Sequence, residues 1–184
     1  MMNRNDQKME VAAVKTVRWW EVALLTIVVT VLSRLTTGSP QKKNRKYYEQ
    51  ETKQPAWAPP GWVFGPAWML NNVFMIRALL YLLKNGKDLP ERKKLLVLQG
   101  LIWGVFLSFG FVYFRKRSNI LGGVWTLADA VFSSMSFIIA RRVNKGLANH
   151  YLPLMAWTSF ASTIAVPQAL QNKDHFLGTR ALLN

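Results

Sequence analysis

Two ionisable residues lie inside long apolar stretches of the sequence, where a charge needs a partner. Arg77 is the single charge within residues 62–83, and Asp129 is the single charge within residues 120–140. Intramembrane charges usually face other helices and mark a pathway or an ion pair. The two stretches would run in the same direction, with the residues roughly 9 Å apart in depth at 1.5 Å per residue. A long arginine could bridge part of that gap, and snorkelling of Arg77 to the interface is the other interpretation.

Asp129 must be hydrogen-bonded, paired or protonated, because an unpaired charge in hydrocarbon costs at least ~2.5 kcal/mol. We expect its side chain to face helices or polar backbone and to serve assembly of the bundle, not chemistry. Asp129→Asn should then keep the fold. Asp129→Leu is expected to lower stability in detergent, since it would remove the partner of a buried polar group.

The other reactive residue types form no catalytic or metal-binding pattern. Cysteine is absent, which excludes disulfides, thiolate catalysis and cysteine-type zinc sites. His150 and His175 fall at a predicted membrane end and in the C-terminal tail, where an interfacial histidine is far commoner than a haem ligand. No Ser-His-acid or metal-ligand spacing occurs in the apolar stretches. The sequence therefore predicts no catalytic residue, no metal site and no enzyme.

The elements that must position these residues are apolar stretches close to the roughly 20 residues that cross a bilayer. The clearest has no charge and lies between the basic runs 92–94 and 115–117. In the first stretch, Glu21 and Arg34 shorten the charge-free part, but adjacent tryptophans favour an interface anchor. The prediction is an all-α integral membrane protein, a bundle of five transmembrane helices at about residues 19–35, 62–83, 95–114, 120–140 and 151–170.

The charge of the chain fits a lipid surface better than a nucleic acid. There are 24 Lys and Arg against 9 Asp and Glu, a net charge of +15. The basic residues stand at the ends of apolar stretches, where they meet headgroups, and no nucleic-acid-binding motif is present. They are divided almost evenly between the two sides, so the positive-inside rule assigns no orientation. Residues 1–18 are predicted as a basic tail leading into a retained span, 19–172 as the membrane domain and 173–184 as a C-terminal tail.

The longest connection, residues 36–61, begins with a basic segment and closes on Gln54-Pro-Ala-Trp-Ala-Pro-Pro-Gly-Trp62. A connection of this length without periodicity is usually functional or disordered. Pro59 and Pro60 suit the first turn of a helix, so the second span is expected to begin there. Trp57 and Trp62 would then lie at the membrane interface.

Extended by Val-Phe-Gly-Pro-Ala-Trp68, this stretch resembles the loop-to-second-helix signature of the TspO/MBR family, the tryptophan-rich sensory proteins and the mitochondrial translocator protein. Further matches are Trp125-Thr-Leu-Ala-Asp129 and Leu152-Pro-Leu-Met-Ala-Trp157-Thr-Ser-Phe-Ala161, with Gln171-Asn172 near the end. The resemblance covers about residues 54–172. It implies the five-helix fold of that family and a receptor-like function.

In function, the resemblance implies binding of a flat apolar ligand, a porphyrin or haem-like molecule or a lipid-like one, with a sensory or translocation role. Basic residues between Lys42 and Lys53 would meet a porphyrin's carboxylates, and indole faces would stack on the macrocycle. Some members bind cholesterol, but no tyrosine follows Tyr151 to complete the weak sterol pattern. Residue-by-residue matching gives the expected ligand-binding set Trp57, Trp68, Trp103, Trp157 and Ala161, with Trp103 assigned by position only. Interface anchoring or packing is the alternative role for each tryptophan.

The sequence also departs from the family pattern. Leu154 stands where the family has tyrosine after the proline, and Ala165 where it has asparagine. These departures support a second interpretation, in which the chain is a structural accessory subunit of a larger membrane complex, such as a mitochondrial respiratory complex. Membrane lipids, a homodimer or that larger complex are the expected partners. A mitochondrial or a bacterial membrane is the expected location.

Overall fold

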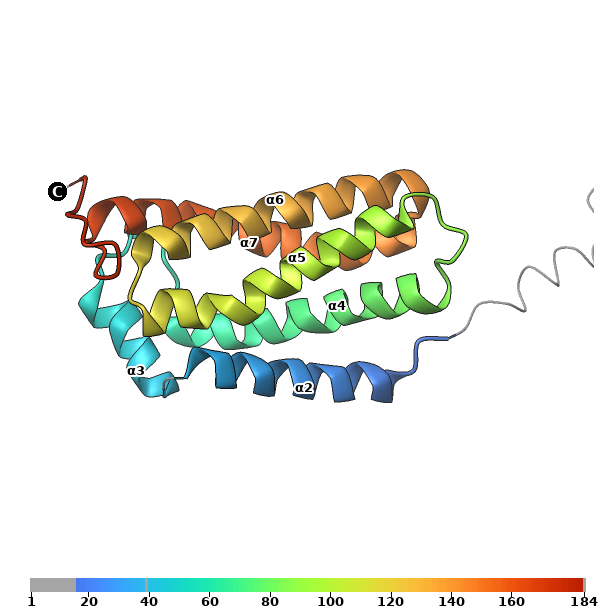
Figure 1. Cartoon of the computed structure of the whole chain (residues 1–184), viewed down its shortest axis with the longest axis horizontal. Coiled ribbons are helices and arrows are strands. Elements are labelled where there is room, and N and C mark those ends of the chain that lie inside the picture. The colour runs from blue at the N-terminus through green and yellow to red at the C-terminus, as the bar shows by residue number, and fades with distance from the viewer. Residues whose placement is uncertain (1–15, 39, 184) are drawn as a thin grey trace, which may run out of the picture.

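The computed structural model describes residues 16–38 and 40–183, which form a bundle of long helices (Figure 1). The bundle consists of α2 (Trp19–Thr37), α4 (Phe64–Lys84), α5 (Arg92–Gly110), α6 (Asn119–Val143) and α7 (Lys145–Gln171). Between α2 and α4 lie a short helix α3 (Gln41–Lys46), a π turn η1 (Tyr47–Glu51) and a 3-10 turn η2 (Gly61–Val63); a second π turn, η3 (Phe111–Arg115), extends α5. The predicted all-α fold is confirmed.

The outer surface of the bundle is apolar along most of its length. Among the described residues, four helical stretches have the length and hydropathy of membrane spans: Trp19–Thr37, Gly61–Lys84, Arg92–Arg115 and Asn119–Val143. In α2, Val22 is the one residue of the helix that is buried, while Ile27 is 62% exposed and Leu35 is 70% exposed. Such a continuous apolar surface has no place in water and fits contact with lipid tails.

The helices are arranged around the bundle in an order that differs from their order in the chain. Each of the following pairs packs together: α2 with α5, α5 with α6, α6 with α7, α7 with α4, and α4 with α2. Figure 1 shows α6 and α7 on one side of the bundle and α2 on the other. The helix α2 is tied to its neighbours at both ends, by an ion pair between Glu21 and Lys84 and by the Thr36 hydroxyl, which donates to the Leu107 carbonyl at 2.6 Å.

The tightest helix pair is α6 with α7, and small residues make it so. Gly123 faces α7 so closely that a β-carbon there would lie 3.3 Å from Ala169 and 3.4 Å from the Ala165 carbonyl. Small residues let membrane helices approach and gain packing and polar contacts. One such contact joins the hydroxyls of Ser133 and Thr158 at 3.0 Å, and it fixes the register of the two antiparallel helices.

The segment from α3 to η2 folds across the end of the bundle and is held there by buried polar contacts. The Tyr47 hydroxyl donates to Asn119 at 3.2 Å, and burial raises the pKa of Tyr47 to about 12, which keeps this hydroxyl a donor. The Gln168 amide of α7 donates to the Thr52 hydroxyl at 3.1 Å. Lys53 and Asn172 exchange two backbone-to-side-chain bonds of 2.7 and 2.9 Å. The long connection is therefore a fixed cap on the bundle.

The helix ends differ in detail from the positions expected from the sequence. Pro60 caps the 3-10 turn η2, and the α-helix begins only at Phe64. The helix α7 begins at Lys145, where the Asn144 side chain accepts the Leu147 N–H at 2.8 Å. The helix can begin at this polar turn because the Asn144 cap accepts one of the backbone N–H groups that have no partner within the helix.

The C-terminal tail is held by Asp174, which is 1% exposed and joins the tail to the start of α6. One carboxylate oxygen accepts the Ser118 hydroxyl at 2.7 Å and the Ile120 N–H at 2.9 Å; the other accepts N–H groups of Phe176 and Leu177. Burial alone would raise the pKa of Asp174, but these donors lower it below its ordinary value. The C-terminal tail is therefore held by contacts within the chain. The N-terminal tail lies outside the described residues, apart from residues 16–18.

We expect Asp174→Ala to release the C-terminal tail and to cost about 0.5–2 kcal/mol, the range for loss of a helix cap. A carboxyl group with a lowered pKa stabilises the fold above its unfolded value, about 3.9, and loses that contribution as the pH falls through the folded value. The stabilisation that Asp174 provides in the wild-type protein should therefore decrease as the pH is lowered below about 3.9. Hydrogen exchange of residues 176–183 measures the release. His175→Gln, at an exposed neighbour, is the control, and equal protection in Asp174→Ala and wild type would contradict the assignment.

Candidate ligand site between the helices

Trp157 forms one wall of an apolar groove between α4 and α7. The groove has a volume of about 370 Å³, within the usual range for a small-molecule site. Its mouth carries Leu70, which is 55% exposed, and Phe160, which is 40% exposed. Asn71, 2% exposed, is its buried polar residue. The complete lining is Ala67, Leu70, Asn71, Pro153, Ala156, Trp157 and Phe160.

Trp68 and Trp103 lie on the inner side of the bundle and share one aromatic neighbour. The centroid of the Phe106 ring is 5.2 Å from that of Trp68 and 5.8 Å from that of Trp103. Both tryptophans also pack on the buried apolar core. Phe64, one turn before Trp68 on the same face of α4, contacts Trp157 at 5.6 Å. Successive turns of α4 therefore carry the aromatic contacts from α7 to α5.

Trp57 and Ala161 occupy the end of α7 that lies nearer the cap. The Trp57 indole is 56% exposed, and its N–H donates to the Thr163 hydroxyl at 3.3 Å, one turn beyond Phe160. Ala161 is half-buried on α7. The Ser133 to Thr158 contact sets the register, so Ala161 lies level with the turn of α6 that contains Asp129. Of the expected set, Trp157 lines the groove, and Trp68 and Trp103 form a separate inner cluster. Trp57 contacts α7 at Thr163, one turn beyond the groove residue Phe160.

Several buried polar atoms in these helices have no hydrogen-bond partner among the described residues. They are the indole nitrogens of Trp103 and Trp157, both carboxyl oxygens of Asp129 and the side-chain oxygen of Gln99. The Gln99 amide nitrogen does have partners, the Met75 carbonyl at 3.3 Å and the Tyr151 hydroxyl at 3.2 Å. Unsatisfied buried groups are uncommon and call for an explanation such as a ligand or a water molecule. Here they offer two N–H donors and three oxygen acceptors within an aromatic interior.

Asp129 is 2% exposed, which confirms that it faces the bundle and not lipid. The expected hydrogen-bond partner is not found, because neither carboxyl oxygen bonds to any part of the chain that the structure describes. Bridging by Arg77 does not occur either. The Arg77 Nε donates to His150 at 3.3 Å, and its guanidinium lies 4.6 Å above the Trp19 ring. Arg77 therefore belongs to the membrane end of the bundle, where a tryptophan and a histidine are available to it.

The histidines and the basic loop are not arranged around the groove. His150 accepts from Arg77, and its other ring nitrogen lies 2.8 Å from the Gly146 carbonyl. Within the described chain, no three His, Cys, Asp or Glu side chains are grouped to hold a metal ion. Lys43 lines a different cavity with Arg115, whereas Lys53 is fixed beside Asn172 at the end of α7. Of these two loop lysines, Lys53 is the one placed near α7.

Apart from Trp157, the residues that line the groove were not predicted as site residues from the sequence. Ala67 and Asn71 are one turn apart on α4 and give α7 a close, partly polar surface, and Phe160 closes the outer edge. The spacing of Ala67, Leu70 and Asn71 at i, i+3 and i+4 marks one helix face. That spacing does not say which helix the face meets. The neighbour of α4 is set by the order of packing around the bundle.

The fold is that of a multi-pass membrane protein, and a groove with Trp157 as one wall opens between two of its helices. A sequence model of the TspO/MBR family matches residues 22–168. The chain belongs to the TspO/MBR family. It is also similar to the tryptophan-rich protein TspO of Chlorobaculum tepidum, with 28% identity over 120 residues, which are 65% of this chain and 76% of that protein.

Proposed function

We propose that this protein binds a flat apolar ligand of the porphyrin class between its helices, and that α4 and α7 form the entrance. The observation that carries the proposal is Trp157, whose ring walls the groove and whose buried indole N–H has no partner among the described residues. An indole face suits stacking on a macrocycle, and its N–H can donate to a polar edge. Trp68, Trp103 and Ala161 would line the deeper part, and Trp57 would lie at the rim.

The residues of the groove fit such a ligand. The lining is apolar apart from Asn71, and the volume of about 370 Å³ admits part of a macrocycle while the exposed mouth leaves room for the rest. The unpartnered oxygens of Asp129 and Gln99 could accept N–H groups of a ligand that goes deeper. A site that binds a ligand in this way would suit a role in sensing or translocation. No step of catalysis follows from these groups.

The groove also supports a route of entry. Leu70 and Phe160 at its mouth are exposed on the apolar surface that faces lipid tails. An apolar ligand partitions into the bilayer, so it would reach the site sideways from the membrane. The cap over residues 40–60 is bonded to Gln168 and Asn172, which makes entry from the aqueous end less direct.

Titration with protoporphyrin, followed by quenching of intrinsic tryptophan fluorescence, tests the proposal. Trp157→Ala is expected to weaken binding by about 2 kcal/mol, roughly 30-fold in Kd, as for a buried aromatic anchor. Trp157→Phe should lose less, because it keeps a ring for stacking and removes only the N–H. Trp62→Ala, at a 61% exposed position, is the matched control and should change Kd by less than about twofold.

Two results would count against the proposal. Absence of saturable quenching in the wild-type protein would exclude the ligand class. A Kd unchanged in Trp157→Ala would place the ligand elsewhere, whatever its class. Folding of each variant is checked by thermal unfolding in the same detergent.

The accessory-subunit interpretation is favoured by one feature, the apolar side chains that the C-terminal tail exposes: Phe176, Leu177, Leu182 and Leu183. Such a patch at the membrane end suits either a partner subunit or the lipid interface. Purification of the full chain in mild detergent separates the two functions. Stoichiometric co-purification of a defined set of membrane proteins, lost in a Phe176→Ser and Leu177→Ser variant, would favour the subunit. A chain that runs alone would count against it.

A further inference from the structure

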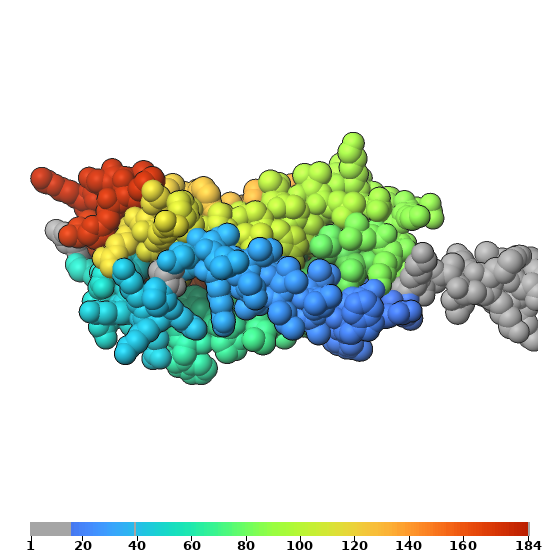
Figure 2. Space-filling model, turned by 60° about the horizontal axis from the view of Figure 1, so that its bottom comes forward, coloured from blue at the N-terminus to red at the C-terminus, as the bar shows by residue number. Residues whose placement is uncertain are grey.

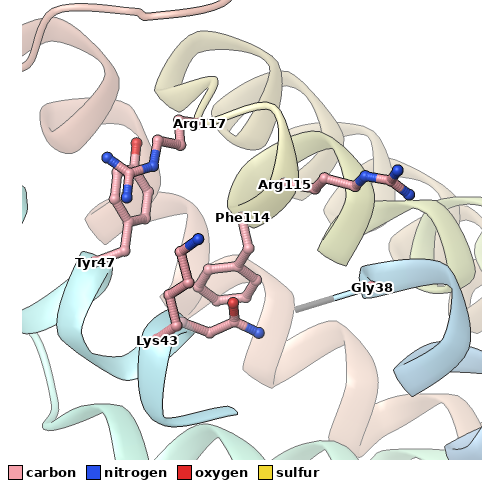
Figure 3. A pocket seen from close by; sticks show the side chains of 7 residues that line it. Gly38, Lys43, Tyr47, Phe114, Arg115 and Arg117 are labelled. Atoms are coloured by element: carbon pink, nitrogen blue, oxygen red, sulfur yellow. The ribbon is translucent and has the colours of Figure 1, made fainter. Parts of the chain in front are cut away.

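A second cavity, of about 130 Å³, lies at the end of the bundle where α2, α3 and η3 meet (Figure 3). A water molecule takes about 30 Å³ in the liquid, so the cavity is large enough for a tetrahedral oxyanion. Its lining is unlike that of the groove. Three of its seven residues are cationic, in the set Gly38, Lys43, Asn44, Tyr47, Phe114, Arg115 and Arg117.

Arg117 is held in place by its neighbours. Its guanidinium forms an ion pair with Glu51 at 2.9 Å and lies 5.3 Å from the centre of the Tyr47 ring. The residue has a positive φ of 55°, which turns the chain between η3 and α6. Arg117 therefore forms a rigid, charge-compensated side of the cavity, with the net charge supplied by the other cations.

Lys43 and Arg115 supply that charge. The described residues include every Asp and Glu between residues 16 and 183. Neither Lys43 nor Arg115 forms an ion pair with any of these carboxylates. Lys43 is exposed on the short helix α3, and Figure 3 shows its ammonium extending toward Arg117, while the Arg115 guanidinium extends on the opposite side, near Gly38. Lysine binds a phosphate as a compact point charge and arginine binds it through two parallel N–H bonds.

Gly38 makes room for Arg115. The glycine ends α2 with φ 62°, and a β-carbon there would lie 3.3 Å from a guanidinium nitrogen of Arg115. A larger residue would therefore be strained in its backbone and would press on the arginine. The guanidinium can lie across the end of α2 because Gly38 presents no side chain.

The cavity lies beside the lipid-facing surface. Leu35, one turn before Gly38, is 70% exposed, and Phe111, one turn before Arg115, is 36% exposed. Figure 2 shows α2, α3 and the segment that contains η3 on one face of the molecule. A phosphate in the cavity would thus have apolar helix surface directly next to it. Basic pockets between membrane helices are the usual places where phospholipid headgroups bind specifically.

We propose that this cavity binds the phosphate group of an anionic phospholipid, with Lys43 and Arg115 as the ligands and Arg117 as the fixed wall. The acyl chains would run along the exposed surface of α2 and α5. The proposal is independent of the porphyrin site, since the cavity and the α4 to α7 groove share no lining residue. Soluble phosphate has the same chemistry, so the experiment must separate the two sources.

Native mass spectrometry of the full chain in a neutral detergent, titrated with dioleoyl phosphatidic acid, tests the proposal. Lys43→Gln with Arg115→Gln is expected to weaken the first bound lipid by about tenfold or more, as for loss of charge-assisted bonds. Arg141→Gln with Arg142→Gln is the matched control: it removes the same charge from exposed positions at the opposite membrane end and should leave that Kd unchanged. Dioleoyl phosphatidylcholine, which has no net charge, should bind equally weakly to the wild-type protein and to both double variants.

Two outcomes would contradict the proposal, and a third would support it. Equal weakening in both double variants would show general attraction of anionic lipid to a basic protein and would overturn the proposal. Displacement of the lipid by millimolar inorganic phosphate would assign the site to a soluble phosphate, and no displacement would support the lipid. Lys43→Gln alone, at an exposed position, keeps the test valid if the double variant does not fold.

Discussion

Gly122→Ala is expected to destabilise the protein by about 1–3 kcal/mol, the usual cost of forcing a methyl group into a packed interior. A β-carbon at this position of α6 would lie 2.5 Å from the Tyr113 ring. That ring is 4% exposed and cannot move aside, because it stacks on Phe109 at 5.4 Å and meets Phe114 at 4.7 Å. Either α6 must shift or the ring must leave its place.

The Tyr113 hydroxyl makes the effect larger than a local clash. It accepts from the Gln168 amide, which also donates to Thr52 in the cap. Displacing the ring would therefore loosen the connection between α7 and the loop. We expect faster proteolysis of residues 40–60 in Gly122→Ala, in addition to a lower Tm, by about 2–4 °C for each kcal/mol in a chain of this size.

The matched control is Gly104→Ala on α5, where a β-carbon would meet no atom within 4 Å. Alanine there should be neutral or should stabilise the helix by up to about 1 kcal/mol, because it reduces the entropy of the unfolded backbone. The double variant Tyr113→Ala with Gly122→Ala tests the mechanism. If the second substitution costs as much in the Tyr113→Ala background as in wild type, the clash with the ring is not the cause.

Asp129→Val is expected to raise the free energy of unfolding by about 1–3 kcal/mol, the cost that an unsatisfied buried polar group imposes. The carboxyl group is 2% exposed, and both its oxygens lack a partner among the described residues. Nothing in that part of the chain would be left unpaired by an apolar replacement. This sign is opposite to the one expected from sequence, where a partner was assumed.

Asp129→Asn is the matched control, since it keeps the shape and leaves a polar group unsatisfied, so no gain in stability should appear. Thermal unfolding without ligand gives the comparison. A Tm of Asp129→Val below that of wild type would mean that the carboxyl group has a partner after all. If Asp129 contacts the porphyrin, the same variant should weaken quenching, so the stability gain and the binding loss would separate fold from function.

The sequence by itself determined the five long helices of the bundle, the class of protein and the family. Lipid requires long apolar stretches with internally satisfied backbone, so stretches near 20 residues flanked by basic runs give the helices almost directly. The segment from Gln54 to Trp68 indicated the family because Pro59, Pro60 and the tryptophans are unusual residues in a fixed order. Burial of Asp129 also followed from the cost of exposing it to lipid.

Only the tertiary structure decided which faces of the helices pack against one another. A membrane helix is apolar on its lipid side and on its inner side, so its pattern does not reveal its rotation or its neighbour, as it would for an amphipathic helix in water. Arg77 was therefore paired with the wrong residue: the packing of α2 and α7 beside α4 brings it Trp19 and His150. In the same way, Trp157 faces α4, and Lys43 and Arg115 line one cavity, because the helices pack in an order that differs from their order in the chain. No local spacing in the sequence encodes that order.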